Sequence, residues 1–233
     1  MKITTWNIRH GGGKRVNSII ESLSKYSDSD VLILTEFRNN QNKDLLIENL
    51  KKTGYNFFKS VNVEPKLNSV LIATKTPFIS YTFPELKEHE QRVIKIELNK
   101  FKIYGCYFPI KKAKKQVFEF LISEIEKFGT DNLIFTGDFN TGKHCLDEKG
   151  ATFMYSNFFE DFENIGLMDA WRFINKNKKE FSWYSHKQNG FRLDHFFIDK
   201  KLESSIIACY YDHKLREENI SDHSLITLTV NQK

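Results

Sequence analysis

The chain has 233 residues, enough to bury one sizeable core, and its 40% hydrophobic and 28% charged residues exclude a disordered or fibrous protein. Three scattered cysteines exclude a disulfide framework, and we expect them to be reduced. No apolar run suggests a signal peptide or a membrane span, so the sequence predicts a single cytoplasmic domain over residues 1–233. The net charge of +5 suits a polyanionic partner, although a mild lysine excess is also common in proteins that bind none.

Strands and helices alternate along the chain. The strands predicted from two-residue periodicity are 2–8, 31–35, 69–75, 92–98, 101–107, 132–137, 193–199 and 224–230. Helical spacing of apolar residues appears at 16–23, 117–125 and 158–165. Clean alternation, as in 93–98, favours antiparallel or mixed sheets. Because eight strands exceed what one small open sheet usually carries, the pattern predicts an α/β fold of two packed sheets with helices outside.

Polar residues recur where the predicted strands leave the core. Such strand ends are suited to carry functional side chains, because a rigid sheet positions them at the surface. Six segments show this pattern: Thr5-Trp6-Asn7, Leu34-Thr35-Glu36, Tyr107-Phe108-Pro109, Gly137-Asp138-Phe139-Asn140, Arg192-Leu193-Asp194 and Ser221-Asp222-His223.

Asp138 and Asn140 lie two residues apart, so an extended backbone would point both side chains the same way while Phe139 enters the core. One carboxylate could then take a proton from water, and the amide could hold the oxygen in line. Taken alone, the segment also fits an ordinary turn, since Gly, Asp and Asn all favour turns.

Glu36 and the Asp222-His223 pair offer further candidate ligands and bases. A carboxylate at the end of the apolar run before Glu36 requires compensation, which either a metal ion or Arg38 could supply. Asp222 and His223 are adjacent, so in an extended segment they point to opposite sides, one toward a metal and the other toward a phosphate. The alternative is a helix N-cap or turn built on Ser221 and Asp222.

Together and in order, the six segments resemble the endonuclease/exonuclease/phosphatase superfamily, and within it the exonuclease III-like abasic-site endonucleases. The resemblance runs from Ile3 to Val230 and includes 69–75, 165–172 and 181–184. It implies a four-layered α/β sandwich of the DNase I-like type, with two mixed sheets packed face to face and an active site at one sheet edge. It also implies a hydrolase that acts on DNA.

The resemblance assigns Glu36 as the main ligand of a Mg²⁺ or Mn²⁺ ion, with Asp222 and Asn7 close to the metal. The residue types agree with this assignment. A phosphodiester needs its negative charge neutralised as the transition state forms, and carboxylate and amide oxygens suit magnesium better than zinc.

The resemblance also assigns the catalytic residues. Asp138 would orient or deprotonate the attacking water, and Asn140 would position that water and the phosphate. Asp194 would hold His223, which would stabilise the pentacovalent transition state. Tyr107 would contact the phosphate.

Arg9 and Ile110 depart from the family pattern. Arg9 follows Asn7-Ile8 where relatives often have Asn or Asp, and it either binds phosphate or is an exposed loop residue. Ile110 stands where repair enzymes typically have Asn or Gln, which weakens the abasic-site assignment.

Two further features bear on a nucleic-acid substrate. Lys111 and Lys112 open a run of four lysines at a helix start, which either contacts a phosphate backbone or is a solvated surface. Trp183 lies in Ser-Trp-Tyr, a segment that resembles the rim of the abasic-endonuclease site and could pack against a sugar or base.

The sequence thus predicts a magnesium-dependent phosphodiester hydrolase acting on DNA, an abasic-site endonuclease and 3′-5′ exonuclease, expected to be a monomer. One alternative is a phosphodiesterase or phosphatase of the same fold that acts on a small nucleotide, RNA or a phospholipid head group. Another is a non-catalytic nucleic-acid-binding module. The presence of all the expected catalytic residues argues against that module.

Overall fold

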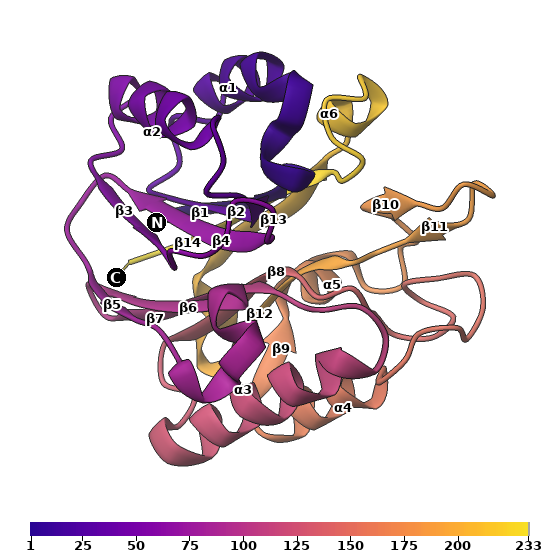
Figure 1. Cartoon of the computed structure of the whole chain (residues 1–233). Helices are drawn as coiled ribbons and strands as arrows, with labels where there is room; N and C mark the ends of the chain where they lie inside the picture. The colour runs from indigo at the N-terminus through magenta and orange to yellow at the C-terminus, as the bar shows by residue number, and fades with distance from the viewer. Residues whose placement is uncertain (233) are drawn as a thin grey trace.

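The computed structural model describes residues 1–232 as two six-stranded sheets that pack face to face. Figure 1 shows α1 and α2 over the outer face of one sheet and α3 and α4 over the outer face of the other. The predicted four-layered α/β sandwich is therefore confirmed. The helices are α1 (Val16–Ser24), α2 (Lys43–Lys52), α3 (Lys114–Phe128), α4 (Asn157–Asn164), α5 (Ala170–Asn175) and α6 (Lys214–Glu217), with 3-10 helices η1 (His10–Arg15), η2 (Pro84–Arg92), η3 (Lys111–Ala113) and η4 (Lys200–Ser205).

The first sheet has the strand order β13-β14-β1-β2-β4-β3. Its central pair, β1 and β2, is parallel, and the other neighbours are antiparallel. Strand β1 also pairs with the distant β14, where Thr5 lies opposite Ile226. The strands are β1 (Lys2–Asn7), β2 (Val31–Phe37), β3 (Phe57–Ser60), β4 (Ser69–Thr74), β13 (Ile206–Asp212) and β14 (Leu225–Val230).

The second sheet has the order β5-β6-β7-β8-β12-β9, and again one central pair, β7 and β8, is parallel. The parallel pairs of the two sheets meet in the middle of the sandwich, where β1 contacts β8 and β2 contacts β7. The strands are β5 (Ile79–Tyr81), β6 (Val93–Leu98), β7 (Phe101–Tyr107), β8 (Leu133–Asp138), β9 (Leu167–Asp169) and β12 (Asp194–Asp199), and a separate hairpin contains β10 (Trp183–Tyr184) and β11 (Gly190–Phe191).

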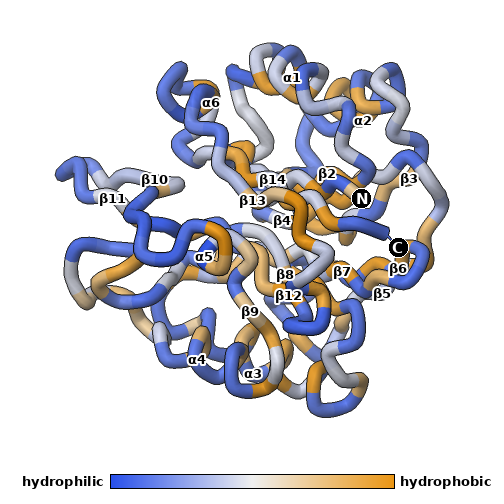
Figure 2. Tube along the Cα trace, turned by 180° about the vertical axis from the view of Figure 1, so that it is seen from behind, coloured by the Kyte–Doolittle hydropathy of each residue, from blue (hydrophilic) through white to orange (hydrophobic). Residues whose placement is uncertain are grey.

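Alternation along the strands divides the core into three layers. In β2, Val31 and Ile33 belong to the cluster between the sheets, whereas Leu32 and Leu34 belong to the cluster under α1 and α2. A third cluster, rich in Phe, fills the space between the second sheet and helices α3 and α4. Figure 2 shows hydrophobic stretches in the strands at the centre of the two sheets. This packing holds the strand ends in fixed positions.

All eight predicted strands and all three predicted helices are present, with ends that differ by up to three residues. The sequence pattern did not reveal β3, β5, β9, β10, β11 or β13, which are short or lie at sheet edges, nor α2, α5 and α6. Over residues 1–232, every helix lacks the combination of length and apolar character that a membrane crossing requires.

Candidate active site

Four of the predicted residues meet where the two central parallel strand pairs end. Asn7 and Glu36 come from β1 and β2, and Tyr107 and Asp138 from β7 and β8. Asn7 Nδ2 donates a hydrogen bond to Glu36 Oε1 at 3.2 Å and another to Asp138 Oδ2 at 3.0 Å. Asn7 therefore joins the predicted metal ligand of one sheet to the predicted base of the other.

The Gly-Asp-Phe-Asn segment is both a strand end and a turn. Gly137 has φ 135°, and a Cβ there would lie 1.9 Å from the carbonyl oxygen of Cys106, so only glycine fits. Asp138 ends β8, and its Oδ1 accepts a hydrogen bond from the backbone N of Asn140 at 2.9 Å. Asn140 has φ 51°, and its Nδ2 donates to the carbonyl of Phe108 at 2.8 Å. The turn thus fixes both side chains.

A break in the β2 register turns Glu36 toward its partners. The pairing with β4 shifts between Thr35 and Phe37, and Glu36 has φ 54°. Its carboxylate accepts hydrogen bonds from Tyr107 Oη at 3.2 Å and from the backbone N of His10 at 2.9 Å. Burial disfavours the Glu36 charge, but His10 outweighs that effect and lowers the pKa of Glu36 to about 2. The carboxylate is ionised at neutral pH.

Arg38 does not form an ion pair with the Glu36 carboxylate. Its Nε donates to Asn68 Oδ1 at 2.6 Å, and its Nη2 lies 3.0 Å from His10 Nδ1. The imidazole of His10 lies beside Glu36 instead, with its Nδ1 2.8 Å from Glu36 Oε2. The alternative of a simple Glu36–Arg38 ion pair is therefore wrong.

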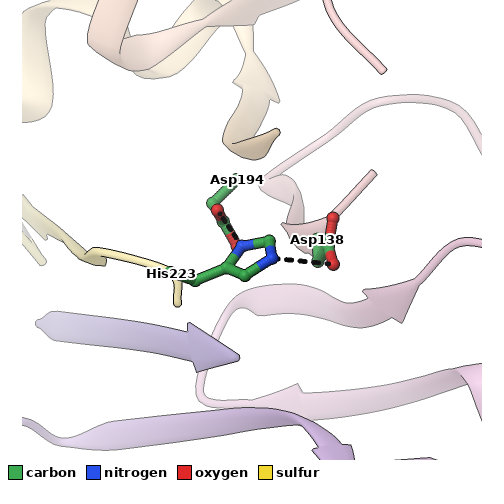
Figure 3. Close-up of side chains that lie close together, drawn as sticks. All are labelled: Asp138, Asp194 and His223. Atoms are coloured by element: carbon green, nitrogen blue, oxygen red, sulfur yellow. Dashed lines mark hydrogen bonds and ion pairs between the residues drawn. The ribbon is translucent and has the colours of Figure 1, made fainter. Parts of the chain in front are cut away.

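His223 lies between two buried carboxylates (Figure 3). Its Nδ1 is 2.8 Å from Asp194 Oδ2, and its Nε2 is 4.0 Å from Asp138 Oδ2. Burial disfavours the imidazolium, but Asp194 and Asp138 outweigh that effect and raise the pKa of His223 to about 10. Burial also raises the pKa of Asp138, to about 7. The pair thus places a positively charged imidazole beside a carboxylate whose pKa is raised.

A cavity of about 510 Å³ opens over these groups. Its lining combines charged and polar side chains with apolar and aromatic ones. The lining residues are His10, Glu36, Tyr107, Ile110, Asp138, Asn140, Phe153, Trp183, Phe191, Leu193, Asp222 and His223.

The remaining predicted residues lie behind or beside this cavity. Asn7 and Asp194 are buried beneath it and contact the lining residues. Arg9 is half exposed, with its Nε 3.7 Å from Asp222 Oδ2, outside the cavity lining. Lys111 and Lys112 are exposed in η3 and also do not line the cavity.

The sequence matches the Endonuclease/Exonuclease/phosphatase family over residues 4–223. The chain belongs to this family. Its members hydrolyse phosphoester bonds, so the predicted class of enzyme is confirmed, as is the resemblance carried by the strand-end motifs. No curated protein matches the sequence.

Solved structures share the fold at low sequence identity. The 3′ phosphatase NExo from Neisseria, bound to a product DNA hairpin, has a TM-score of 0.82 at 21% identity over 99% of each chain. An AP endonuclease from Archaeoglobus fulgidus gives the same three values. The 3′-5′ exonuclease NExo from Neisseria meningitidis has a TM-score of 0.82 at 20% identity, covering 99% of this chain and all of that one.

The donor set around Glu36 fits a hard divalent cation. Glu36 and Asp222 both present carboxylates to the cavity, and oxygen ligands are those that Mg²⁺ and Mn²⁺ accept. Asn7 Oδ1 accepts a hydrogen bond from the backbone N of Arg9 at 2.9 Å and keeps a second lone pair. Asn7 can therefore position Glu36 through its Nδ2 and still stand close to a cation.

Asp138, Asp194 and His223 form a second group whose ligand atoms lie within 4.8 Å of one another. A protonated His223 already balances the two carboxylates, and its Nδ1 is bound to Asp194. This group is therefore suited to proton transfer, and its ligand atoms also lie close enough together to hold a cation.

His10 and Lys114 are two candidate site residues that the sequence reasoning missed. His10 lies between Arg9 and three glycines, and its distance of 26 positions from Glu36 hides their contact. Lys114 belongs to the run of four lysines, for which the sequence left open contact with a phosphate backbone or a solvated surface. It is 4% exposed, and its Nζ donates to the backbone carbonyl of Asn140. Only spacing along α3 could have separated it from its exposed neighbours.

Lys114 gives a testable dependence of stability on pH. Burial lowers the pKa of Lys114 to about 8, against the attraction of Asp138. Between pH 8 and the ordinary lysine pKa near 10.4, the unfolded chain keeps a proton that the folded protein has lost, so stability rises with pH. We expect the unfolding free energy of the wild type to rise over this interval relative to Lys114→Met, measured by urea denaturation.

Lys115 provides the matched control. It is exposed on the same turn and pairs with Glu119 at 3.2 Å. The difference in unfolding free energy between the wild type and Lys115→Met should not change with pH over the same interval. If this difference changed with pH equally for both variants, the role of Lys114 would be contradicted.

A buried ionic network anchors the segment that carries Asp194. Arg192 is fully buried, with its Nε 2.7 Å from Asp147 Oδ1 and its Nη2 2.5 Å from Asp169 Oδ2. Arg172 also contacts Asp147. Two residues after Arg192, the backbone N of Asp194 donates a hydrogen bond to Ser182 Oγ at 3.3 Å. The network thus fixes the position of a predicted catalytic carboxylate.

Proposed function

We propose that the protein is a divalent-cation-dependent phosphodiester hydrolase that acts on DNA, as an abasic-site endonuclease with 3′-5′ exonuclease activity. The observation that carries this proposal is the composition of the cavity. Its lining brings the charged side chains of Glu36, Asp138 and His223 together with the aromatic side chains of Trp183 and Phe191. Such a surface can hold a phosphate and the adjoining sugar at the same time.

The charged and polar residues that line or support the cavity supply the groups that hydrolysis requires. Asp138, with its raised pKa, takes the proton of the attacking water, and Asn140 orients that water. His223, held by Asp194, presents a positive charge to the phosphate as negative charge develops there. Tyr107 Oη, which lies 3.2 Å from Glu36 Oε1, would contact the phosphate. A divalent cation held by Glu36 and Asp222 would neutralise phosphate charge and polarise the bond to be broken.

The surroundings of the cavity favour a polymer over a small phosphoester. Ile110 is exposed and lines the cavity, where it replaces the polar contact typical of the repair enzymes and offers no hydrogen bond to a phosphate. On the other flank, Arg9 and Arg216 line a second cavity of about 290 Å³ that shares Asp222 with the first. Cationic groups beyond the reacting phosphate suit a continuous phosphate backbone. The similarly folded NExo binds a product DNA hairpin.

Incubation of the protein with Mg²⁺ or Mn²⁺ and a duplex carrying one abasic analogue tests this proposal. We expect a single incision at the analogue, measured by gel electrophoresis of an end-labelled strand, and loss of incision when EDTA is added. Cleavage of bis-p-nitrophenyl phosphate without incision of any duplex would instead indicate a small-phosphoester enzyme. DNA binding without turnover of either substrate would indicate the non-catalytic binding module.

A further inference from the structure

His10 converges on Glu36 with both its backbone and its side chain. The backbone N of His10 donates to Glu36 Oε2 at 2.9 Å, and His10 Nδ1 lies 2.8 Å from the same oxygen. Both residues line the 510 Å³ cavity. An imidazole nitrogen therefore stands beside the carboxylate that we assign as the main cation ligand.

The backbone turn that precedes η1 produces this arrangement. Arg9 and His10 have φ values of 51° and 57°, in the left-handed region that non-glycine residues rarely adopt. Asn7 Oδ1 stabilises the turn by accepting the hydrogen bond from the N of Arg9. A non-glycine pair held in this conformation beside a cavity is typical of strain retained at a functional site.

The contacts of His10 Nδ1 make conflicting demands on one atom. Arg38 Nη2, a donor, lies 3.0 Å from it, and Glu36 Oε2, an acceptor, lies 2.8 Å from it. If Nδ1 carries a hydrogen, that donor faces the N–H donor of Arg38. If Nδ1 carries a lone pair instead, that acceptor faces the carboxylate oxygen of Glu36, which is also an acceptor. His10 and Glu36 would both have a partner for their lone pairs if they held a cation together. Arg38 would keep its bond from Nε to Asn68.

We infer that His10 Nδ1 is a ligand, together with Glu36, of the divalent cation that the proposed function requires, and that it shifts the preference of the site from Mg²⁺ toward Mn²⁺. The inference rests on the proposed function for the presence of the cation. Mn²⁺, a first-row transition ion, accepts an imidazole nitrogen more readily than Mg²⁺ does, because Mg²⁺ prefers oxygen ligands throughout. A site of mixed nitrogen and oxygen ligands therefore discriminates between the two ions, which carboxylates alone do poorly.

Two measurements on the metal-free protein test the inference without an activity assay. Isothermal titration calorimetry with MnCl₂ and with MgCl₂ gives the two affinities for the wild type and for His10→Gln. Electron spin echo envelope modulation of bound Mn²⁺ detects coupling to a ligating ¹⁴N nucleus. His186→Gln is the matched control, because His186 is exposed in the loop between β10 and β11.

We expect Mn²⁺ to bind His10→Gln about tenfold or more weakly than the wild type, Mg²⁺ affinity to change little, and the nitrogen coupling to disappear. His186→Gln should match the wild type. Nitrogen coupling that persists in His10→Gln would assign the imidazole to His223 and overturn the inference. Tighter Mn²⁺ binding by His10→Gln would also overturn it, since His10 would then be a competitor that the cation must displace.

The same titrations separate this inference from the proposed function. If the wild type binds Mn²⁺ without nitrogen coupling, only the role of His10 fails. If the wild type binds neither cation, the proposed cation-dependent function fails with it. Circular dichroism melting of His10→Gln serves as the folding check, and we expect a normal transition because the His10 side chain is 56% exposed.

Discussion

Replacement of Asp138 by Asn is expected to lower kcat on an abasic duplex by about 10³-fold, because the amide cannot accept a proton from water. The change preserves the volume of a side chain that is 1% exposed. It also preserves the acceptor for the backbone N of Asn140, which lies 2.9 Å from Asp138 Oδ1. We therefore expect loss of turnover without loss of fold, measured by single-turnover incision and by thermal melting of the same preparation.

Asp131→Asn is the control for this prediction. Asp131 is exposed and pairs with Lys201 at 2.5 Å, far from the cavity lining, so its amide variant should keep full activity. A role for Asp138 in proton transfer would be ruled out if Asp138→Asn retained activity within about tenfold of the wild type, below the usual contribution of a general base.

Replacement of Asp147 by Ala is expected to lower the free energy of unfolding by about 3–5 kcal/mol, since it leaves a buried charge without its partner. Asp147 Oδ1 accepts from Arg192 Nε at 2.7 Å, and its Oδ2 accepts from Arg192 Nη2 at 2.9 Å and from the backbone N of Lys143 at 2.8 Å. Arg172 contacts the same carboxylate. All of these groups lose their acceptor at once. Urea denaturation followed by tryptophan fluorescence measures the loss.

Asp131→Ala again provides the comparison, because its ion pair with Lys201 is exposed to solvent and should contribute little. A loss below about 1 kcal/mol for Asp147→Ala would mean that Asp169 alone balances Arg192, contrary to the expected cost of an unpaired buried charge. Because Arg192 precedes Leu193 and Asp194, we also expect the variant to lose activity at temperatures where it remains folded.

The sequence predicted the fold well where strands are long and buried. The runs around β2 and β8 are continuous hydrophobic segments, and their periodicity and turn residues define them without help from the rest of the chain. Strand β10 contains only two residues, Trp183 and Tyr184, and exists because β11 pairs with it. Such short elements depend on tertiary pairing, which local periodicity does not encode.

The candidate site was predictable to the extent that its residues end long strands. Asp138 and Glu36 occupy such positions, and their clustering follows from the parallel pairs at the centre of each sheet. The contact of His10 with Glu36 depends on a left-handed turn at Arg9 and His10. The residue types Arg and His do not predict such a turn. The burial of Lys114 likewise depends on where α3 begins, an uncertainty of one or two residues that decides which lysine faces inward.

The pairing of β1 with β14 has a consequence for biosynthesis. Strand β1 is made first, yet Thr5 finds its neighbour Ile226 only after most of the chain has been synthesised. Asn7 at the end of β1 and His223 just before β14 must likewise wait for each other. Chains normally fold from the N-terminus as they emerge, but here the candidate catalytic groups cannot come together before β14 has been made. The candidate site of this hydrolase is therefore complete only once β1 and β14 have paired.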